Sequence, residues 1–103
     1  MSQIKWADES GQVKLGMPSD LDLPVASSLV DSLRHGFAVG ESVEVLAESV
    51  ERVSAACIQA LVAASRHAAD HGQKFVISSP SVVMIDICAD LGLASWLNQW
   101  SRS

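Results

Sequence analysis

Apolar and polar residues alternate in two short segments near the start of the chain. Ile4-Lys5-Trp6 and Gln12-Val13-Lys14-Leu15 have the period of two that is typical of half-buried edge strands. The polar stretch Ala7–Gly11 between them is typical of a turn, and Gly16–Asp20 is typical of a loop. The pattern therefore predicts an antiparallel hairpin followed by a loop.

The next segment has helical spacing. Pro24 suits the first position of a helix, because its missing N–H would have no partner there. Gly36 is expected to end the helix. Apolar residues recur three or four positions apart and predict one face that packs on a sheet: Ala26, Leu29, Val30, Leu33 and Phe37.

A strand and a second helix follow. Residues 43–46 form the expected strand, with Glu44 directed to the opposite face from its neighbours. Ser54 is the expected N-cap of the helix, because its hydroxyl can accept a hydrogen bond from the free N–H groups of the first turn. The helix should extend to about His71, before Gly72. Its expected buried face comprises Ile58, Leu61, Val62 and Ser65, with the alanines around them.

The last part of the chain contains one ambiguous segment. Residues 75–77 form a compact apolar strand, but 81–91 has conflicting signals. Its β-branched side chains favour a strand, whereas Ser79 as a cap, Pro80 as first residue and the glycine at the far end favour a helix. Spacing favours the helix, and a last short helix covers 93–100. The residues with helical spacing are Val83 or Met84, Ile87, Cys88 and Leu91.

The predicted order of elements defines the fold class. Strands that alternate with helices imply a partly parallel sheet with helices packed on it, which is an α/β fold. The length of 103 residues suits one domain over 1–103.

Composition narrows the classes of protein. Hydrophobic residues make up 49% of the chain, which is too many for a disordered protein. The apolar runs are far shorter than the ~20 residues that cross a bilayer, so we expect no membrane insertion. The first residues do not combine a basic region with an apolar one, so we expect no signal peptide and a cytoplasmic location. The net charge of −5 and the lack of a basic stripe argue against nucleic acid as a partner.

Few side chains suggest chemistry. Cys57 and Cys88 lie in apolar surroundings without a CxxC spacing, so we expect buried small hydrophobic residues, with a disulfide or redox role as the lesser alternative. His67 and His71 have a spacing that can hold a metal, but no third ligand is evident. No serine lies in a Gly-x-Ser-x-Gly motif, and no glycine-rich phosphate loop occurs. We expect no catalytic residue, cofactor or metal.

Two tryptophans on the last helix allow two interpretations. Trp96 and Trp100 are four residues apart, beside Leu93 and Leu97. Either both indoles pack on the core, or one is partly exposed, as aromatic residues at interfaces often are.

Several segments, taken in order, resemble a known family. A hairpin, an amphipathic helix and a strand precede Val50–Leu61, VERVSAACIQAL. The second helix ends at His71-Gly72-Gln73, the strand Lys74–Ile77 follows, and Asp90-Leu91-Gly92-Leu93 precedes the last helix. Over nearly the whole chain this order resembles the STAS domain, the module of anti-sigma-factor antagonists.

The resemblance implies a four- or five-stranded sheet with helices on one side and a non-enzymatic docking function. In the antagonists, a partner kinase phosphorylates a hydroxyl at the start of the second helix. The family's usual Asp-Ser-Ser-Gly-Leu or Asp-Thr-Ala-Gly-Leu falls here on Ser54–Ile58, SAACI, so Ala55 and Ala56 occupy the acceptor positions. We therefore expect no switch of the usual kind. Ser54 is expected to cap the helix, and a displaced phosphoacceptor is the alternative.

The resemblance also implies a docking surface and a class of partner. The surface comprises the phosphoacceptor-equivalent residues Ser54, Ala55 and Ala56, together with Ser49, Glu51, Arg52 and Gln59. The expected partner is a histidine-kinase-like, anti-sigma or chemotaxis protein, and Cys57 and Gln59 resemble the chemotaxis-associated proteobacterial branch. The alternative is a subunit of a bacterial lipid-asymmetry ABC transporter that binds its ABC ATPase.

Overall fold

The computed structural model describes residues 4–102, and residues 1–3 and 103 of the expected domain lie outside the described residues. A five-stranded sheet has the order β1-β2-β4-β6-β7, and β3 pairs with β5 in a separate two-stranded sheet. The strands are β1 (Lys5–Glu9), β2 (Gln12–Gly16), β3 (Asp20–Leu21), β4 (Ser42–Leu46), β5 (Arg52–Val53), β6 (Lys74–Ser78) and β7 (Ser101–Arg102).

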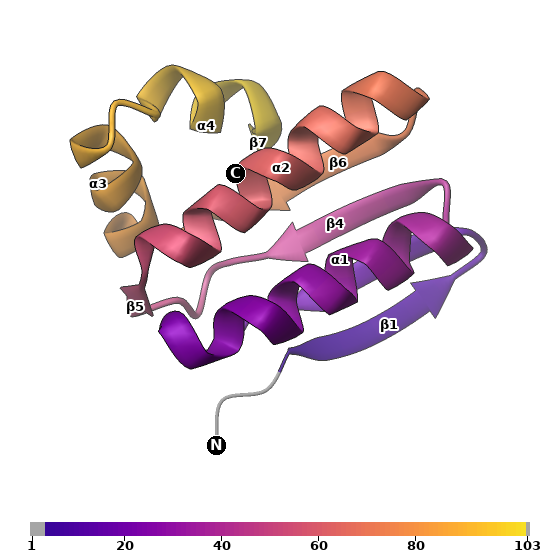
Figure 1. Ribbon diagram of the computed structural model, residues 1–103, viewed down its shortest axis with the longest axis horizontal. Coiled ribbons are helices and arrows are strands. Elements are labelled where there is room, and N and C mark those ends of the chain that lie inside the picture. Colours follow the sequence, from indigo (N-terminus) through magenta and orange to yellow (C-terminus); the bar gives the residue numbers. More distant parts are fainter. Residues whose placement is uncertain (1–3, 103) are drawn as a thin grey trace.

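The helices lie on one face of the main sheet (Figure 1). They are the 3-10 helix η1 (Leu23–Val25) and the α-helices α1 (Ala26–Val39), α2 (Ala55–His71), α3 (Val82–Asp90) and α4 (Ala94–Trp100). β1 and β2 are antiparallel, and β2, β4, β6 and β7 are parallel to one another. Parallel neighbours need a crossover connection, which α1 supplies between β2 and β4, α2 between β4 and β6, and α3 with α4 between β6 and β7. The expected α/β fold with a mixed sheet is confirmed.

The hairpin forms as predicted, but its turn is shorter. Ala7–Glu9, expected in the turn, continues β1. Ser10 and Gly11 alone connect the strands, with φ angles of 53° and 84°. Two consecutive left-handed residues match the twist of the flanking strands, and glycine adopts this conformation without steric strain.

The first α-helix begins two residues after the predicted start and ends after the predicted end. Pro24 lies in η1, before the α-helix, and Gly36 is a buried residue inside α1 rather than its end. A Cβ on Gly36 would lie 3.2 Å from Val43 Cγ2, so the missing side chain allows α1 to pack closely on β4. The C-cap is Gly40, whose N–H donates to the Gly36 carbonyl.

The second and third helices form as predicted, with one change of cap. α2 ends at His71, and Gly72 follows in the left-handed conformation with φ 65°. In α3 the N-cap is Ser81, whose Oγ accepts from the Met84 N–H at 3.2 Å, rather than Ser79. Three elements were not predicted: β3, β5 and β7. Each is two residues long, and β3 lies partly in the expected loop.

The core lies between the sheet and the helices. It includes Leu15, Val45, Ile58, Leu61 and Ile77, none of which is exposed. Both cysteines are free and buried. Trp96 and Trp100 are each partly buried. The Trp96 Nε1–H donates to Ser65 Oγ at 2.9 Å, and the Trp100 ring lies 6.0 Å from that of Phe75.

Candidate functional site

The start of α2 is held in place by hydrogen bonds to β3 and the loop before it. The N–H groups of Glu51 and Arg52 donate to the Ser19 carbonyl at 2.7 and 3.0 Å, and the Ser54 N–H donates to the Leu21 carbonyl at 2.7 Å. These contacts fix the direction in which α2 begins. The short β3–β5 pair therefore positions the segment that the sequence singles out.

Ser54 is the N-cap of α2, as predicted. Its Oγ accepts from the Cys57 N–H at 3.3 Å, and its backbone is extended. The Cys57 thiol lies 3.5 Å from the Asp22 carbonyl, to which it donates, and this contact joins α2 to the residue before η1. The Ser54 hydroxyl oxygen is thus directed at the helix backbone.

The seven residues of the expected docking surface lie on one continuous segment, 49–59. Ser54 and Ala56 are half-buried, and the others are exposed: Ser49, Glu51, Arg52, Ala55 and Gln59. Small side chains form the first turn of α2, so a partner's backbone can approach closely there. Whether a partner binds these residues stays a prediction.

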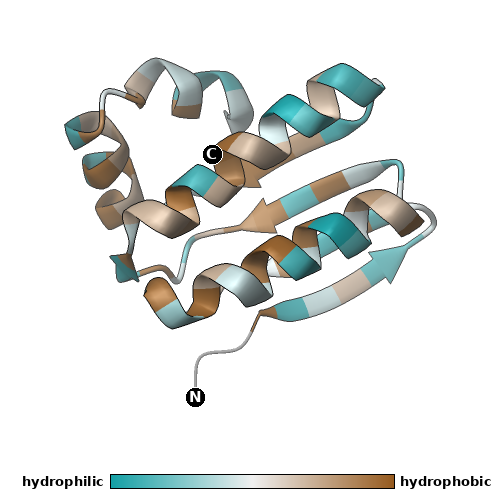
Figure 2. Cartoon of the chain, in the orientation of Figure 1, coloured by the Kyte–Doolittle hydropathy of each residue, from teal (hydrophilic) through white to brown (hydrophobic). Residues whose placement is uncertain are grey.

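Exposed apolar side chains lie on the two elements beside this segment. η1 contacts α2, and α3 contacts β5, which leads directly into α2. Leu23 of η1 is 68% exposed and Val82 of α3 is 72% exposed, and Val83 and Ile85 are also exposed. We call Leu23, Val82, Val83 and Ile85 the apolar collar. Figure 2 shows the hydrophobic character of α3.

The residues whose helical spacing predicted α3 differ in burial. Met84 and Cys88 are fully buried and Ile87 is half-buried, but Val83 and Leu91 are exposed. A helix of nine residues at the edge of the fold buries only a narrow stripe, so its other apolar residues remain in solvent. Sequence periodicity did not identify the collar, because the same residue types also form cores.

The elements around the collar are rich in acids. The acids there are Asp20, Asp22, Glu48, Glu51, Asp86 and Asp90, and the cation among them is Arg52. All of them except Asp20, which is half-buried, are exposed. The exposed apolar side chains of the collar are therefore accompanied by acidic residues on the same or neighbouring elements.

The other candidate residues do not form a reactive centre. His67 and His71 are exposed and stacked, with ring centroids 4.1 Å apart. Among residues 4–102, no group of three His, Cys, Asp or Glu side chains is placed to hold a metal ion. Burial raises the pKa of the Cys88 thiol, which disfavours the reactive thiolate. Within the same residues, no helix is long and apolar enough to cross a membrane.

A groove of about 670 Å³ lies between α1 and α2. Its walls are mostly aliphatic, with Ala60, Ala63 and Ala64 on α2. The Gln73 side chain lines the groove, and its Nε2 donates to the carbonyls of Phe37 and Gly40. The amide therefore satisfies carbonyl groups at the C-terminal end of α1.

Comparison with known proteins gives one family and several similar folds. A family model described as "Mlab, STAS domain" matches residues 2–98. No curated protein matches the chain. The anti-sigma factor antagonist SpoIIAA in its unphosphorylated form superposes with a TM-score of 0.78 at 10% identity, over 99% of this chain and 86% of that chain.

Two further solved structures have the same fold. The Bacillus cell fate determinant SpoIIAA in its phosphorylated form has a TM-score of 0.76 and 12% identity, over 99% of this chain and 89% of the other. A STAS domain protein from Planctomyces limnophilus has a TM-score of 0.70 and 17% identity, over 96% and 87% of the two chains. At these identities the likeness is one of fold.

Proposed function

The chain belongs to the Mlab STAS domain family, and from this premise we propose that it is a non-enzymatic docking module that binds a protein partner through the start of α2. The observation that carries the proposal is the apolar collar. Monomeric proteins rarely expose large apolar side chains in groups, and where they do the group is often an interaction site. Here the group flanks the segment that we propose for docking.

The surface has the composition of a protein interface. An interface usually has an apolar centre and a polar rim. The collar supplies the centre, and Asp22, Glu51 and Asp86 contribute to the rim. A fitting partner therefore presents an apolar centre with basic residues around it, because complementary charge speeds association and selects partners.

We propose that docking is constitutive. Ala55 and Ala56 carry no hydroxyl, and the Ser54 oxygen accepts a hydrogen bond from the helix backbone. A phosphate on Ser54 would replace this cap and add nearly two negative charges three positions after Glu51. The proposed partner is a cytoplasmic histidine-kinase-like, anti-sigma or chemotaxis protein, and it binds without a phosphate switch.

A second candidate function uses the same surface. The missing hydroxyls at Ala55 and Ala56 favour a role that needs no phosphate chemistry, such as that of a subunit that binds the ABC ATPase of a lipid-asymmetry transporter. Gene neighbourhood distinguishes the two. Adjacent ATPase and permease genes support transport, and an adjacent kinase or chemotaxis cluster supports signalling.

Binding measurements with purified proteins encoded by neighbouring genes test the surface. Val82→Ser combined with Ile85→Ser removes apolar contact from two exposed positions. We expect the affinity to fall about tenfold or more, as for central interface residues. The matched control is Val39→Ser, which changes an exposed valine at the last residue of α1 and should leave binding unchanged.

Two results would contradict the proposal. Wild-type affinity in the Val82→Ser/Ile85→Ser variant, with a folded protein by circular dichroism, would show that the collar does not dock. Intact-mass measurement after incubation with a neighbouring kinase and ATP tests the constitutive part. A stoichiometric gain of one phosphate that disappears in Ser54→Ala would show that Ser54 is a phosphoacceptor.

A further inference from the structure

The face of the main sheet opposite the helices is uncovered and carries an unusual share of the cations. Paired residues on neighbouring strands share a face, so Lys14, Glu44 and Val76 lie on the opposite side from the buried Val13, Val43 and Phe75. We call this side the open sheet face. Its charged residues are Lys5, Glu9, Lys14, Glu44, Lys74 and Arg102.

The charges of the chain are segregated. The open sheet face has four of the seven cations, including all three lysines, and two of the twelve acids, which gives +2. The remaining three cations and ten acids give −7, in agreement with the net charge of −5. The open sheet face is therefore locally positive, although the net charge of the whole chain is negative.

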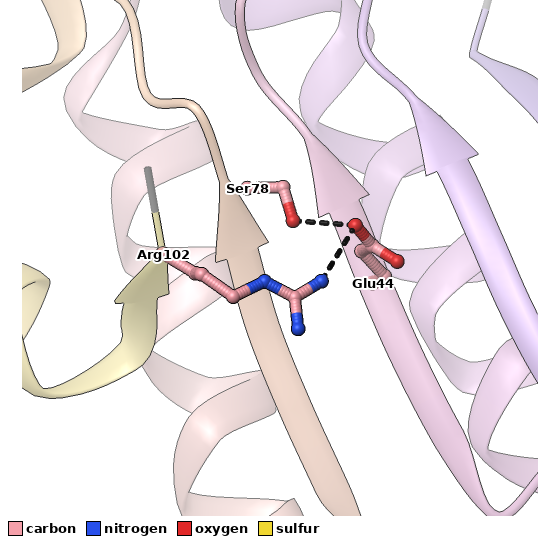
Figure 3. Close-up of polar contacts among 3 residues, drawn as sticks. All are labelled: Glu44, Ser78 and Arg102. Atoms are coloured by element: carbon pink, nitrogen blue, oxygen red, sulfur yellow. Dashed lines mark hydrogen bonds and ion pairs between the residues drawn. The ribbon is translucent and has the colours of Figure 1, made fainter.

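One of the two acids on this face, Glu44, is paired with a cation of the same face, Arg102. The buried Glu44 Oε2 accepts from Ser78 Oγ at 2.5 Å and from Arg102 Nη2 at 3.2 Å (Figure 3). Among residues 4–102 this is the one ion pair, so no lysine has an ionic partner there. The other acid, Glu9, lies at the end of β1, and Glu41 immediately precedes β4 at the same end of the sheet.

The three lysines are distributed across the strands. Lys5 lies on β1, Lys14 on β2 and Lys74 on β6. Neighbouring strands are about 4.8 Å apart, and alternate residues along a strand are about 6.7 Å apart. From the strand register, the Cα atoms of Lys5 and Lys14 are therefore about 8 Å apart, and those of Lys14 and Lys74 about 12 Å. These separations match alternate and more distant side chains of an extended peptide.

We propose that the open sheet face binds an acidic segment of a partner protein through Lys5, Lys14 and Lys74. This surface is separate from the collar, because the helices and the open face are on opposite sides of the sheet. A protein segment fits better than a lipid surface. None of the large exposed apolar residues lies on this face to insert into a bilayer, and three lysines alone contribute only about 1 kcal/mol each at an anionic membrane.

The probe is a peptide of ten glutamates, titrated into the full ¹⁵N-labelled chain and followed by amide chemical shifts. Because the net charge repels this peptide, binding reports a local positive surface. We expect shifts in β1, β2, β4 and β6 that diminish with added salt. Lys14→Gln/Lys74→Gln should weaken binding about fivefold. The control Arg34→Gln/Arg66→Gln removes the same charge from exposed helix positions and should leave the Kd within about twofold.

Other outcomes would overturn the proposal. Shifts confined to α1 and α2, or equal weakening in both double variants, would exclude the open sheet face. Cosedimentation with phosphatidylglycerol vesicles that requires Lys14 and Lys74, without a peptide response, would identify a membrane surface instead. Self-association by sedimentation velocity that the same two substitutions abolish would identify a second copy of the chain.

Discussion

The N-cap of α2 allows a quantitative test of how the site is built. In Ser54→Ala the Cys57 N–H loses the Oγ acceptor at 3.3 Å. The same N–H also lies 3.1 Å from the Ser54 carbonyl, which the substitution leaves in place. Loss of an N-cap costs about 0.5–2 kcal/mol. Because one acceptor remains, we expect the lower part of that range, about 0.5–1 kcal/mol.

Urea unfolding and thermal melts measure this loss. For a domain of this size, a loss of about 1 kcal/mol lowers the Tm by roughly 4–8 °C, so Ser54→Ala should melt roughly 2–8 °C below the wild type. Ser54→Gly should lose only a few tenths of a kcal/mol. Ser54→Asp keeps an acceptor and gains from the helix dipole, although Glu51 beside it opposes the added charge.

The matched control is Ser49→Ala, in the exposed loop before β5, which should change stability by less than about 0.5 kcal/mol. If Ser54→Ala is as stable as Ser49→Ala, the side-chain cap contributes nothing and the carbonyl alone satisfies the amide. The Ser54 hydroxyl would then be free to reorient, and the part of the argument for constitutive docking that rests on its capping role would fail.

Further substitutions at Gly40, Glu44 and Cys88 probe other parts of the structure. Gly40→Ala places a Cβ 2.7 Å from Val13 Cγ2 and 2.8 Å from the Gly11 carbonyl oxygen. It should therefore lower the free energy of unfolding, measured in urea, by about 1–3 kcal/mol. The loss should exceed that of Gly36→Ala, whose closest contact is 3.2 Å. Glu44→Gln keeps an acceptor for the Ser78 hydroxyl and loses only a partly exposed ion pair, so it should lower the free energy of unfolding by less than about 1 kcal/mol. Glu44→Ala leaves the Ser78 hydroxyl unpaired and should lower it by about 1–3 kcal/mol. Because burial raises the pKa of the Cys88 thiol, the free energy of unfolding should decline as pH rises above the ordinary thiol pKa of about 8.5. Unfolding measured between pH 7 and pH 10 should show a smaller decline for Cys88→Ala than for the wild type.

Local patterns determined most of the elements of this protein. The alternation around Val13 indicated the hairpin, and the spacing of apolar residues indicated α1 and α2. In α3, β-branched residues favour a strand, yet a capping serine and the glycine after Leu91 agree with the helix that forms. The N-cap role of Ser54 was also predictable, because a cap depends on residues within one turn.

Tertiary structure decided the details that have no local signal. Strands of two residues, such as β3 and β5, are too short to have a period, and they form because other segments offer unpaired backbone groups. Gly36 was expected to end α1, but it packs against Val43 of the sheet. The helix continues to Val39 because this packing stabilises it beyond the glycine.

The two candidate surfaces depend on the same long-range arrangement. Leu23 and Val82 are 59 positions apart and flank the start of α2 only because η1 and α3 pack at one end of the fold. Glu44 and Arg102, 58 positions apart, meet because β6 lies between β4 and β7. The sequence by itself determined where helices and strands form, since hydrophobic period and capping are local. The tertiary structure decided which apolar residues remain exposed and which charges share a face, because both depend on what packs beside them.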